Sequence, residues 1–161
     1  MIQYIGKREF KEVKVLLRFN SNSVSDTEAI AEKLGRVLKS GNVVAYFGGL
    51  GMGKTAFTRG LAKGMGIKAD ISSPTFAIVN DYGGNPPLVH FDMYKVESWD
   101  DLYSSGFFDY LDMGAVLAVE WSENIENALP DDTIRVTIEQ GDSPEKRIIT
   151  IEGINDENFS S

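Results

Sequence analysis

The chain has 161 residues, of which 42% are hydrophobic and 25% charged, a composition typical of one globular domain. It contains no cysteine, which excludes disulfides, thiolate metal sites and thiol catalysis. A formal net charge of −8 argues against a surface that binds DNA or grips RNA directly. Charged residues interrupt the first twenty positions and the longest apolar runs have five residues, so we expect a cytoplasmic protein with no export signal and no membrane segment.

Charge is divided unevenly along the chain. Residues 1–80 carry 12 Lys and Arg against 6 Asp and Glu, a net charge of +6, whereas residues 81–161 carry 4 against 18, a net charge of −14. Two interpretations are open. Either two solvated faces differ in charge, or a basic half holds an anion and an acidic half meets a metal or a partner protein.

Hydrophobic periodicity predicts one domain over residues 1–161, because the sequence has no internal repeat or long linker. Two capping-box spacings, Ser25 to Glu28 and Ser98 to Asp101, are expected to begin helices. In chain order the predicted elements are a strand over 13–19 within an N-terminal extension of residues 1–24, a helix over 25–40, a strand over 43–47, a helix over 54–65, strands over 75–82 and 88–93, a short helix over 98–105, a strand over 115–121, a hairpin of strands over 133–138 and 147–151, and a loose tail over 153–161.

The strongest motif is G-G-L-G-M-G-K-T from Gly48 to Thr55, which matches G-x-x-x-x-G-K-[ST] between a predicted strand and a predicted helix. Its glycines let main-chain amides turn inward toward phosphate oxygens. Lys54 would reach the β- and γ-phosphates of a nucleotide, and Thr55 would offer its hydroxyl to Mg²⁺. We therefore predict an α/β protein with a P-loop NTPase fold: a mainly parallel sheet flanked by helices, with antiparallel additions at its C-terminal end.

A P-loop also needs a carboxylate on a neighbouring strand to hold the magnesium water shell. Asp92 and Glu120 each stand at the end of a predicted strand. Glu120 ends the more apolar strand, so it is the better candidate for Mg²⁺ ligand or water-polarising base. Asp92 could share the metal or orient the attacking water.

Three further residues near these motifs each have two interpretations. Thr75 lies after the P-loop helix, where it would sense the γ-phosphate or simply begin a strand. Trp121 would be a core residue or a platform for a base. His90, the only histidine, would be a neighbour of the site or a structural residue, since it lies two positions before Asp92.

Together these motifs resemble the TsaE family, bacterial P-loop ATPases also called YjeE that are required to make threonylcarbamoyladenosine in tRNA. The resemblance covers about residues 25–152. It is carried by the helix with Thr27, the loop from Gly48, S-P-T-F at 73–76, N-D-Y at 80–82, H-F-D-M-Y-K at 90–95 and V-E-W at 119–121. The sequence departs from the usual family pattern at Gly49, where an acidic residue is usual, and at Lys95, where arginine is usual.

The resemblance implies a Mg²⁺-dependent ATPase that works with the proteins TsaB and TsaD and meets tRNA only through that complex. It implies Mg²⁺ on Thr55 and Glu120, functional importance for Thr75, Asp92 and Trp121, and a position for Thr27 near the nucleotide. The residues expected to hold ATP are Gly48, Gly51, Met52, Gly53, Lys54, Thr55 and Ala56.

We expect ATP hydrolysis by the chain alone to be slow, because the sequence shows no obvious arginine finger, and a partner would then complete or regulate the site. Arg59 on the P-loop helix stays open as a finger. Two alternatives stay open. One is a small-molecule kinase with Asp92 as base, and the other is a nucleotide-gated binding module with little catalysis. A GTPase is less favoured because the sequence has no N-K-x-D motif.

Overall fold

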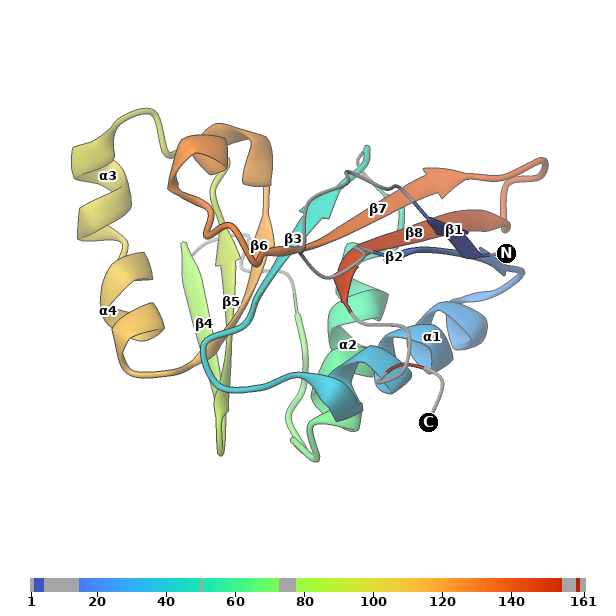
Figure 1. Cartoon of the computed structure of the whole chain (residues 1–161), viewed down its shortest axis with the longest axis horizontal. Helices are drawn as coiled ribbons and strands as arrows, with labels where there is room; N and C mark the ends of the chain where they lie inside the picture. The colour runs from blue at the N-terminus through green and yellow to red at the C-terminus, as the bar shows by residue number, and fades with distance from the viewer. Residues whose placement is uncertain (1, 5–14, 50, 73–77, 155–158, 160–161) are drawn as a thin grey trace.

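One mixed sheet organises the part of the chain that this computed structural model describes, residues 2–4, 15–49, 51–72, 78–154 and 159 (Figure 1). Its strands are β1 (Ile2–Tyr4), β2 (Val15–Ser21), β3 (Val43–Phe47), β4 (Val79–Gly84), β5 (Pro87–Asp92), β6 (Val116–Glu120), β7 (Ile134–Gln140) and β8 (Arg147–Ile154). The helices are α1 (Val24–Val37), α2 (Lys54–Gly64), α3 (Trp99–Ser104), α4 (Phe107–Asp112) and the 3-10 helix η1 (Ser122–Ala128).

The strand order is β1-β2-β8-β7-β3-β6-β5-β4. The central strands β7, β3, β6 and β5 run parallel, whereas β8, β2 and β1 extend one edge antiparallel and β4 extends the other. The prediction of a mainly parallel sheet was therefore right only for the centre. Antiparallel strands also close the β4 edge, because a short turn can join only antiparallel neighbours.

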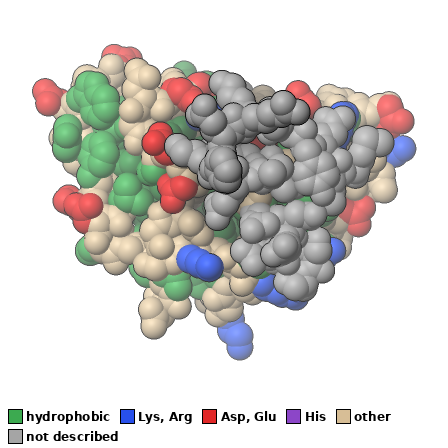
Figure 2. All heavy atoms as spheres, viewed as in Figure 1, with side chains coloured by type: hydrophobic (Ala, Val, Ile, Leu, Met, Phe, Trp, Pro, Cys, Tyr) green, Lys and Arg blue, Asp and Glu red, His purple; other side chains and the backbone are tan. Residues whose placement is uncertain are grey.

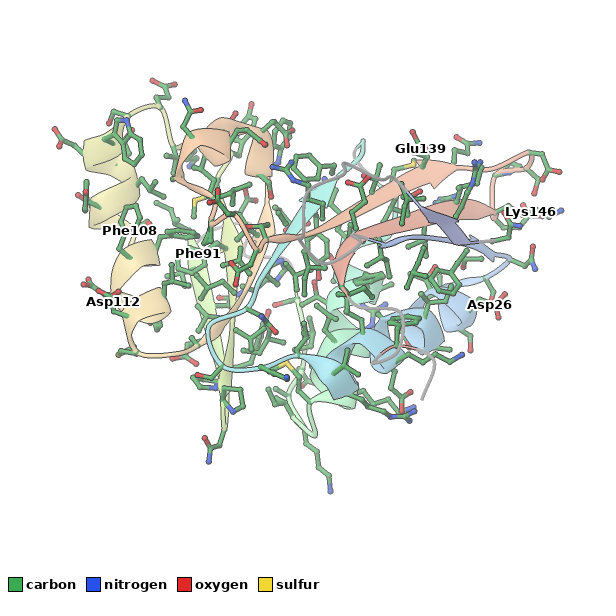
Figure 3. All side chains as sticks on the ribbon, in the orientation of Figure 1. Asp26, Phe91, Phe108, Asp112, Glu139 and Lys146 are labelled. Atoms are coloured by element: carbon green, nitrogen blue, oxygen red, sulfur yellow. The ribbon has the colours of Figure 1, made fainter. Side chains whose placement is uncertain are left out.

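Helices cover both faces of the sheet, and each face has its own apolar core. Successive residues of a strand point to opposite faces, so Val44 of β3 packs toward α1 and α2 while Val43 packs on the other side. On that second side Phe91 of β5, labelled in Figure 3, lies beside α4. Its ring centroid is 5.8 Å from that of Phe107 and 5.9 Å from that of Tyr110.

Glycines bring α1 and α2 into close contact. A Cβ at Gly60 would collide with the carbonyl oxygen of Glu28, and a Cβ at Gly64 would collide with that of Glu32. Because both partners advance by four residues, the two helices run in the same direction and their N-termini lie at the same end of the molecule. That end is where α2 leaves the predicted phosphate loop.

The first helix begins earlier than the sequence predicted. Ser23, and not Ser25, is the N-cap of α1: its Oγ accepts a hydrogen bond from the backbone N–H of Asp26 at 3.0 Å. Asp26 in turn accepts from the backbone N–H of Asn22 at 2.9 Å. Asp26 therefore accepts from the residue before the N-cap and not from Ser23 itself, so the cap resembles a capping box but is not reciprocal. The cap predicted at Ser98 was correct, since its Oγ accepts from Asp101 N–H.

Other differences concern short elements and the C-terminal end. The sequence analysis did not predict β1, α4 or η1. Residues 153 and 154 were expected in a loose tail but belong to β8, and the ring of Phe159 is buried 5.4 Å from that of Phe19. Of the predicted strand over 75–82, residues 75–77 lie outside the described part of the chain, and the observed strand β4 begins at Val79 and continues to Gly84.

None of the helices in the described residues is both long enough and apolar enough to cross a membrane.

Candidate nucleotide site

The predicted phosphate loop lies between the end of β3 at Phe47 and the start of α2 at Lys54. Gly48 has a φ of 129°, and a Cβ there would collide with the carbonyl oxygen of Ile138 on β7, so the loop must begin with glycine. Gly53, with a φ of 102°, is the N-cap of α2, and no side chain of the described residues caps it. The backbone amides of the first turn are therefore free to bind an anion.

Lys54, the first residue of α2, lies beside the end of β6. Its Nζ is 5.8 Å from the centre of the Trp121 ring, which also packs against the ring of Tyr94 at 4.8 Å. Trp121 has a φ of 57°, which is uncommon for a residue other than glycine, at the point where the chain turns from β6 into η1. Two residues that the sequence analysis selected separately, Lys54 and Trp121, are thus brought together.

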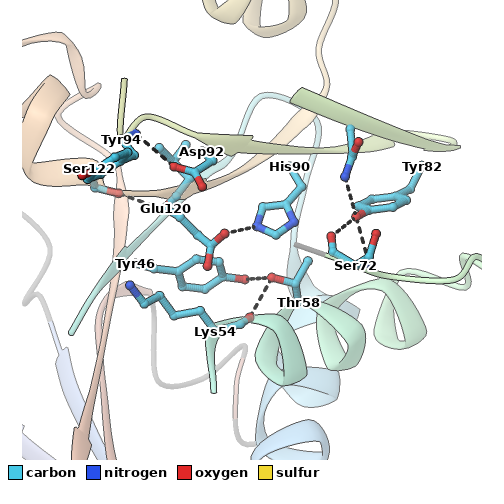
Figure 4. Close-up of polar contacts among 12 residues, drawn as sticks. Tyr46, Lys54, Thr58, Ser72, Tyr82, His90, Asp92, Tyr94, Glu120 and Ser122 are labelled. Carbon is cyan, nitrogen blue, oxygen red and sulfur yellow. Dashed lines mark hydrogen bonds and ion pairs between the residues drawn. The ribbon is translucent and has the colours of Figure 1, made fainter. Parts of the chain in front are cut away.

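The two predicted carboxylates stand next to each other at the ends of parallel strands. Asp92 of β5 is in register with Glu120 of β6, as the expected sheet edge required. Asp92 is half-buried and its Oδ1 accepts a hydrogen bond from the backbone N–H of Tyr94 at 2.9 Å, whereas Glu120 is only 8% exposed (Figure 4). The described residues contain no cluster of three or more His, Cys, Asp or Glu side chains that could enclose a metal ion. Any metal here would be held by fewer protein ligands.

His90 lies directly behind Glu120. Its Nε2 is 3.2 Å from Glu120 Oε2, although the atoms lack hydrogen-bond geometry, and the imidazole is completely buried between Tyr46 and Tyr82 (Figure 4). Of the two interpretations of His90, the structure supports a neighbour of the site. The spacing of two from Asp92 was the signal, because His90 then shares a face with the strand-end carboxylates.

The sequence analysis missed a buried hydroxyl pair that joins β3 to α2. Tyr46 Oη lies 2.8 Å from Thr58 Oγ1, and Thr58 Oγ1 donates to the carbonyl oxygen of Lys54 at 2.9 Å. Burial raises the pKa of Tyr46 well above its ordinary value, the hydrogen bond with Thr58 opposes that rise, and the nearby charge of Glu120 adds to it. This pair anchors the first turn of α2 to the sheet under the phosphate loop.

A residue of the C-terminal hairpin also reaches the loop. Arg147, the first residue of β8, donates from Nη2 to the carbonyl oxygen of Gly51 at 3.4 Å. It also donates from Nη1 to the carbonyl oxygens of Pro144 and Lys146 at 2.6 and 2.9 Å. Nothing in the sequence signalled this contact, because 96 positions separate Arg147 from Gly51.

The remaining selected residues lie around this cluster or outside it. Met52 packs against the α1–α2 core and Ala56 is buried, so both support the loop. Thr27 is buried at the same end of the molecule, but its hydroxyl lies 2.7 Å from that of Ser21. Arg59 donates to Glu28 Oε1 at 2.8 Å and so extends along α1. Thr75 lies outside the described residues.

Known proteins of one family are similar to this chain. The family model described as "Threonylcarbamoyl adenosine biosynthesis protein TsaE" matches residues 21–149. The chain is 36% identical over 122 residues to the tRNA threonylcarbamoyladenosine biosynthesis protein TsaE of Treponema pallidum, covering 76% of this chain and 90% of that protein. It is 36% identical over 133 residues to the protein of that name from Bacillus subtilis, covering 82% and 83%. The crystal structure of Bacillus subtilis YdiB is similar, with a TM-score of 0.73, 29% identity and coverage of 93% of both chains.

Proposed function

The chain belongs to the TsaE family of threonylcarbamoyl adenosine biosynthesis proteins, and we propose that it serves this tRNA modification as a Mg²⁺-dependent ATPase with a P-loop NTPase fold. One observation carries the proposal. The glycine-built loop and the uncapped start of α2 stand beside the two strand-end carboxylates Asp92 and Glu120.

The residues present suit ATP and Mg²⁺. Free backbone amides at the start of α2 and the ammonium group of Lys54 match the charge of a triphosphate. Mg²⁺ usually keeps several water ligands and takes only one or two protein carboxylates together with phosphate oxygens. The hydroxyl of Thr55 and the carboxylates of Glu120 and Asp92 provide such a limited set of protein ligands. The described residues form no closed cage of His, Cys, Asp or Glu side chains, and Mg²⁺ does not require one.

Each polar side chain of the site has a task in hydrolysis. When bound, Mg²⁺–ATP supplies the phosphoryl group that water attacks. Lys54 and the loop amides stabilise the phosphate oxygens as negative charge spreads over them. Glu120, held with little exposure between Asp92, His90 and Tyr46, orients the attacking water and accepts its proton, while Trp121 shields Lys54 from solvent.

We further propose that TsaB and TsaD complete or regulate this site in the cytoplasm and that tRNA is met only through them. Arg59, the residue left open as an arginine finger, is paired with Glu28. Arg147 approaches the loop through the carbonyl oxygen of Gly51 and not through an amide that faces an anion. The acidic C-terminal half of the chain also disfavours a direct grip on tRNA.

Calorimetry with Mg²⁺–ATP and a phosphate-release assay, each with and without TsaB and TsaD, test this proposal. We expect wild-type chain to bind Mg²⁺–ATP and to release phosphate faster with the partners. Lys54→Ala should lose about a hundredfold or more in turnover, and Glu120→Gln should still bind nucleotide but lose turnover similarly. Absence of binding heat would contradict the proposal. Phosphate passing to a metabolite would instead show a kinase, and full complex function in Glu120→Gln would show a binding module.

A further inference from the structure

A hollow of about 170 Å³ lies between η1 and the connection from β5 to α3. Val96, Leu102, Ile125 and Ala128 line it with apolar side chains, and the indole of Trp99 forms one wall. Trp99 is 54% exposed, which is high for the largest apolar side chain. The hollow is thus an apolar depression on the α3 side of the sheet, away from α1 and α2.

The walls of the hollow are fixed before anything binds. Asn124 of η1 donates from Nδ2 to the carbonyl oxygen of Met93 at 2.9 Å, which ties η1 to the chain that leaves β5. Ser98 caps α3 through the N–H of Asp101, and the N–H of Glu97 donates to Asp101 Oδ2 at 3.0 Å. Because these contacts already order the site, binding of a partner would cost little conformational entropy here.

The rim of the hollow is acidic. Residues 96–134 contain ten Asp and Glu and no Lys or Arg. Glu126 on the rim forms an ion pair with Arg135, whereas the exposed Glu97 and Glu123 form no ion pair with any described residue. Figure 2 shows apolar side chains gathered over α3 and α4 with acidic side chains around them. Two exposed carboxylates therefore flank an apolar, aromatic depression.

We propose that this hollow receives an arginine side chain from the docking surface of a partner protein. Its volume of about 170 Å³ and the two carboxylates at its rim suit one long cationic side chain. The methylene stem of arginine would pack on the apolar floor and its guanidinium would stack on Trp99 between Glu97 and Glu123. The negative charge of the rim repels the phosphates of a nucleic acid.

A second depression connects this hollow to the candidate nucleotide site. It shares Val96, Glu97 and Asn124 with the hollow and is lined further along by Tyr94, Lys95 and Trp121. Trp121 in turn contacts Lys54. A partner seated in the hollow would therefore border the phosphate site, which is how docking could change turnover. An effect of docking on turnover rests on the proposed ATPase function, and the hollow is the surface through which a partner would change that activity.

The test compares two double charge reversals in the full chain. Glu97→Lys with Glu123→Lys alters the rim, whereas Asp112→Lys with Glu145→Lys changes net charge equally at exposed positions, the first at the far end of α4 (Figure 3). Calorimetry measures the affinity of each chain for the purified TsaB–TsaD pair with Mg²⁺–ATP present. We expect the rim variant and Trp99→Ala to bind the TsaB–TsaD pair about tenfold or more weakly, and the pair no longer to stimulate their phosphate release. The control variant should bind the pair as wild type does.

Phosphate release by each chain alone separates this proposal from the ATPase proposal. Basal turnover should be equal in wild type, rim variant and control, and a wild type without turnover would contradict the ATPase function itself. Equal weakening of both double variants would show that only overall charge matters and would overturn the proposed site. The proposed site would also be overturned if the rim variant kept wild-type affinity or if wild type did not bind the TsaB–TsaD pair. Two further results would overturn it: a wild-type dimer in sedimentation that the rim variant does not form, or binding of tRNA at the hollow that is tighter than binding of the pair.

Discussion

The two faces of the sheet are covered in different ways. On one face α1 and α2 meet through glycines that leave no space for a Cβ, and Gly48 of the adjoining loop meets β7 equally closely. On the other face α3 and α4 have six residues each, and large side chains remain in solvent: Trp99 is 54% and Tyr103 63% exposed.

This difference follows the division of charge in the sequence. The helices that cover the first face, here called the closed face, lie within residues 1–80, which carry a net charge of +6. The helices that cover the second face, here called the open face, lie within residues 81–161, which carry a net charge of −14. A phosphate loop works only if its amides are held in one geometry, which tight backbone contacts provide. A docking surface must keep apolar area exposed until a partner covers it. The two faces thus suit two different tasks, an anion cradle and an interaction surface.

Adjacent glycines in the loop give the largest expected effect. A Cβ at Gly48 would collide with the Ile138 carbonyl oxygen at a φ of 129°, so Gly48→Ala should lower the free energy of unfolding by about 4 kcal/mol. A Cβ at Gly49 would meet only Met52 Cγ at 3.9 Å, so Gly49→Ala should change it by about 0.5 kcal/mol or less. Urea denaturation measures both. Equal losses would show that the loop is not held against β7.

The contrast between the faces can be tested at one position on each. Gly60→Ala would push α2 away from the Glu28 carbonyl oxygen and the Ala31 side chain, and should cost about 3 kcal/mol. Tyr103→Ala removes a larger group but one that solvent already surrounds, and should cost about 1 kcal/mol or less. Thermal unfolding of both variants is the measurement. A larger loss for Tyr103→Ala would mean that the open face is part of the core.

Much of the candidate site could be predicted from the sequence because its residues follow local rules. The loop motif fixes Lys54 at the start of a helix, and the apolar strands fix Asp92 and Glu120 at the same sheet edge. The capping box at Ser98 was also correct. These features depend on spacing along a few residues, which the sequence contains directly.

The features that prediction missed depend on contacts between distant segments. Arg147 reaches Gly51 only because β8 lies beside β7, and Tyr46 meets Thr58 only because α2 packs on β3. The burial of Phe159 against Phe19 likewise comes from tertiary packing. The α1 cap forms at Ser23 and Asp26, just before the predicted pair Ser25 and Glu28, because both pairs have the same spacing and the sequence alone does not choose between them.

The buried tyrosine under the loop gives a pH-dependent test of the closed face. The pKa of Tyr46 lies well above 10.0 in the folded chain, so only the unfolded chain releases this proton near pH 10 and stability falls as pH rises above it. Tyr46 should account for a loss of about 1.4 kcal/mol between about pH 9 and pH 11. Tyr46→Phe, which costs about 1 kcal/mol at neutral pH, should lack that part of the slope. Parallel curves for the two proteins would contradict the burial of Tyr46.

Substitution of two arginines, Arg59 and Arg147, should give the smallest effects. The two variants distinguish a surface ion pair from a hydrogen bond that supports nucleotide binding. Arg59 pairs with Glu28 at the surface, so Arg59→Ala should change stability by about 0.5 kcal/mol or less and leave phosphate release within about twofold of wild type. Arg147→Ala removes a hydrogen bond to the loop and should weaken Mg²⁺–ATP binding by about fivefold. Calorimetry and phosphate release on both variants measure this. The opposite result, in which Arg59→Ala lost turnover and Arg147→Ala did not, would mean that Arg59 leaves Glu28 and contacts the nucleotide. Helices α1 and α2 would then contribute a catalytic group in addition to holding the phosphate loop.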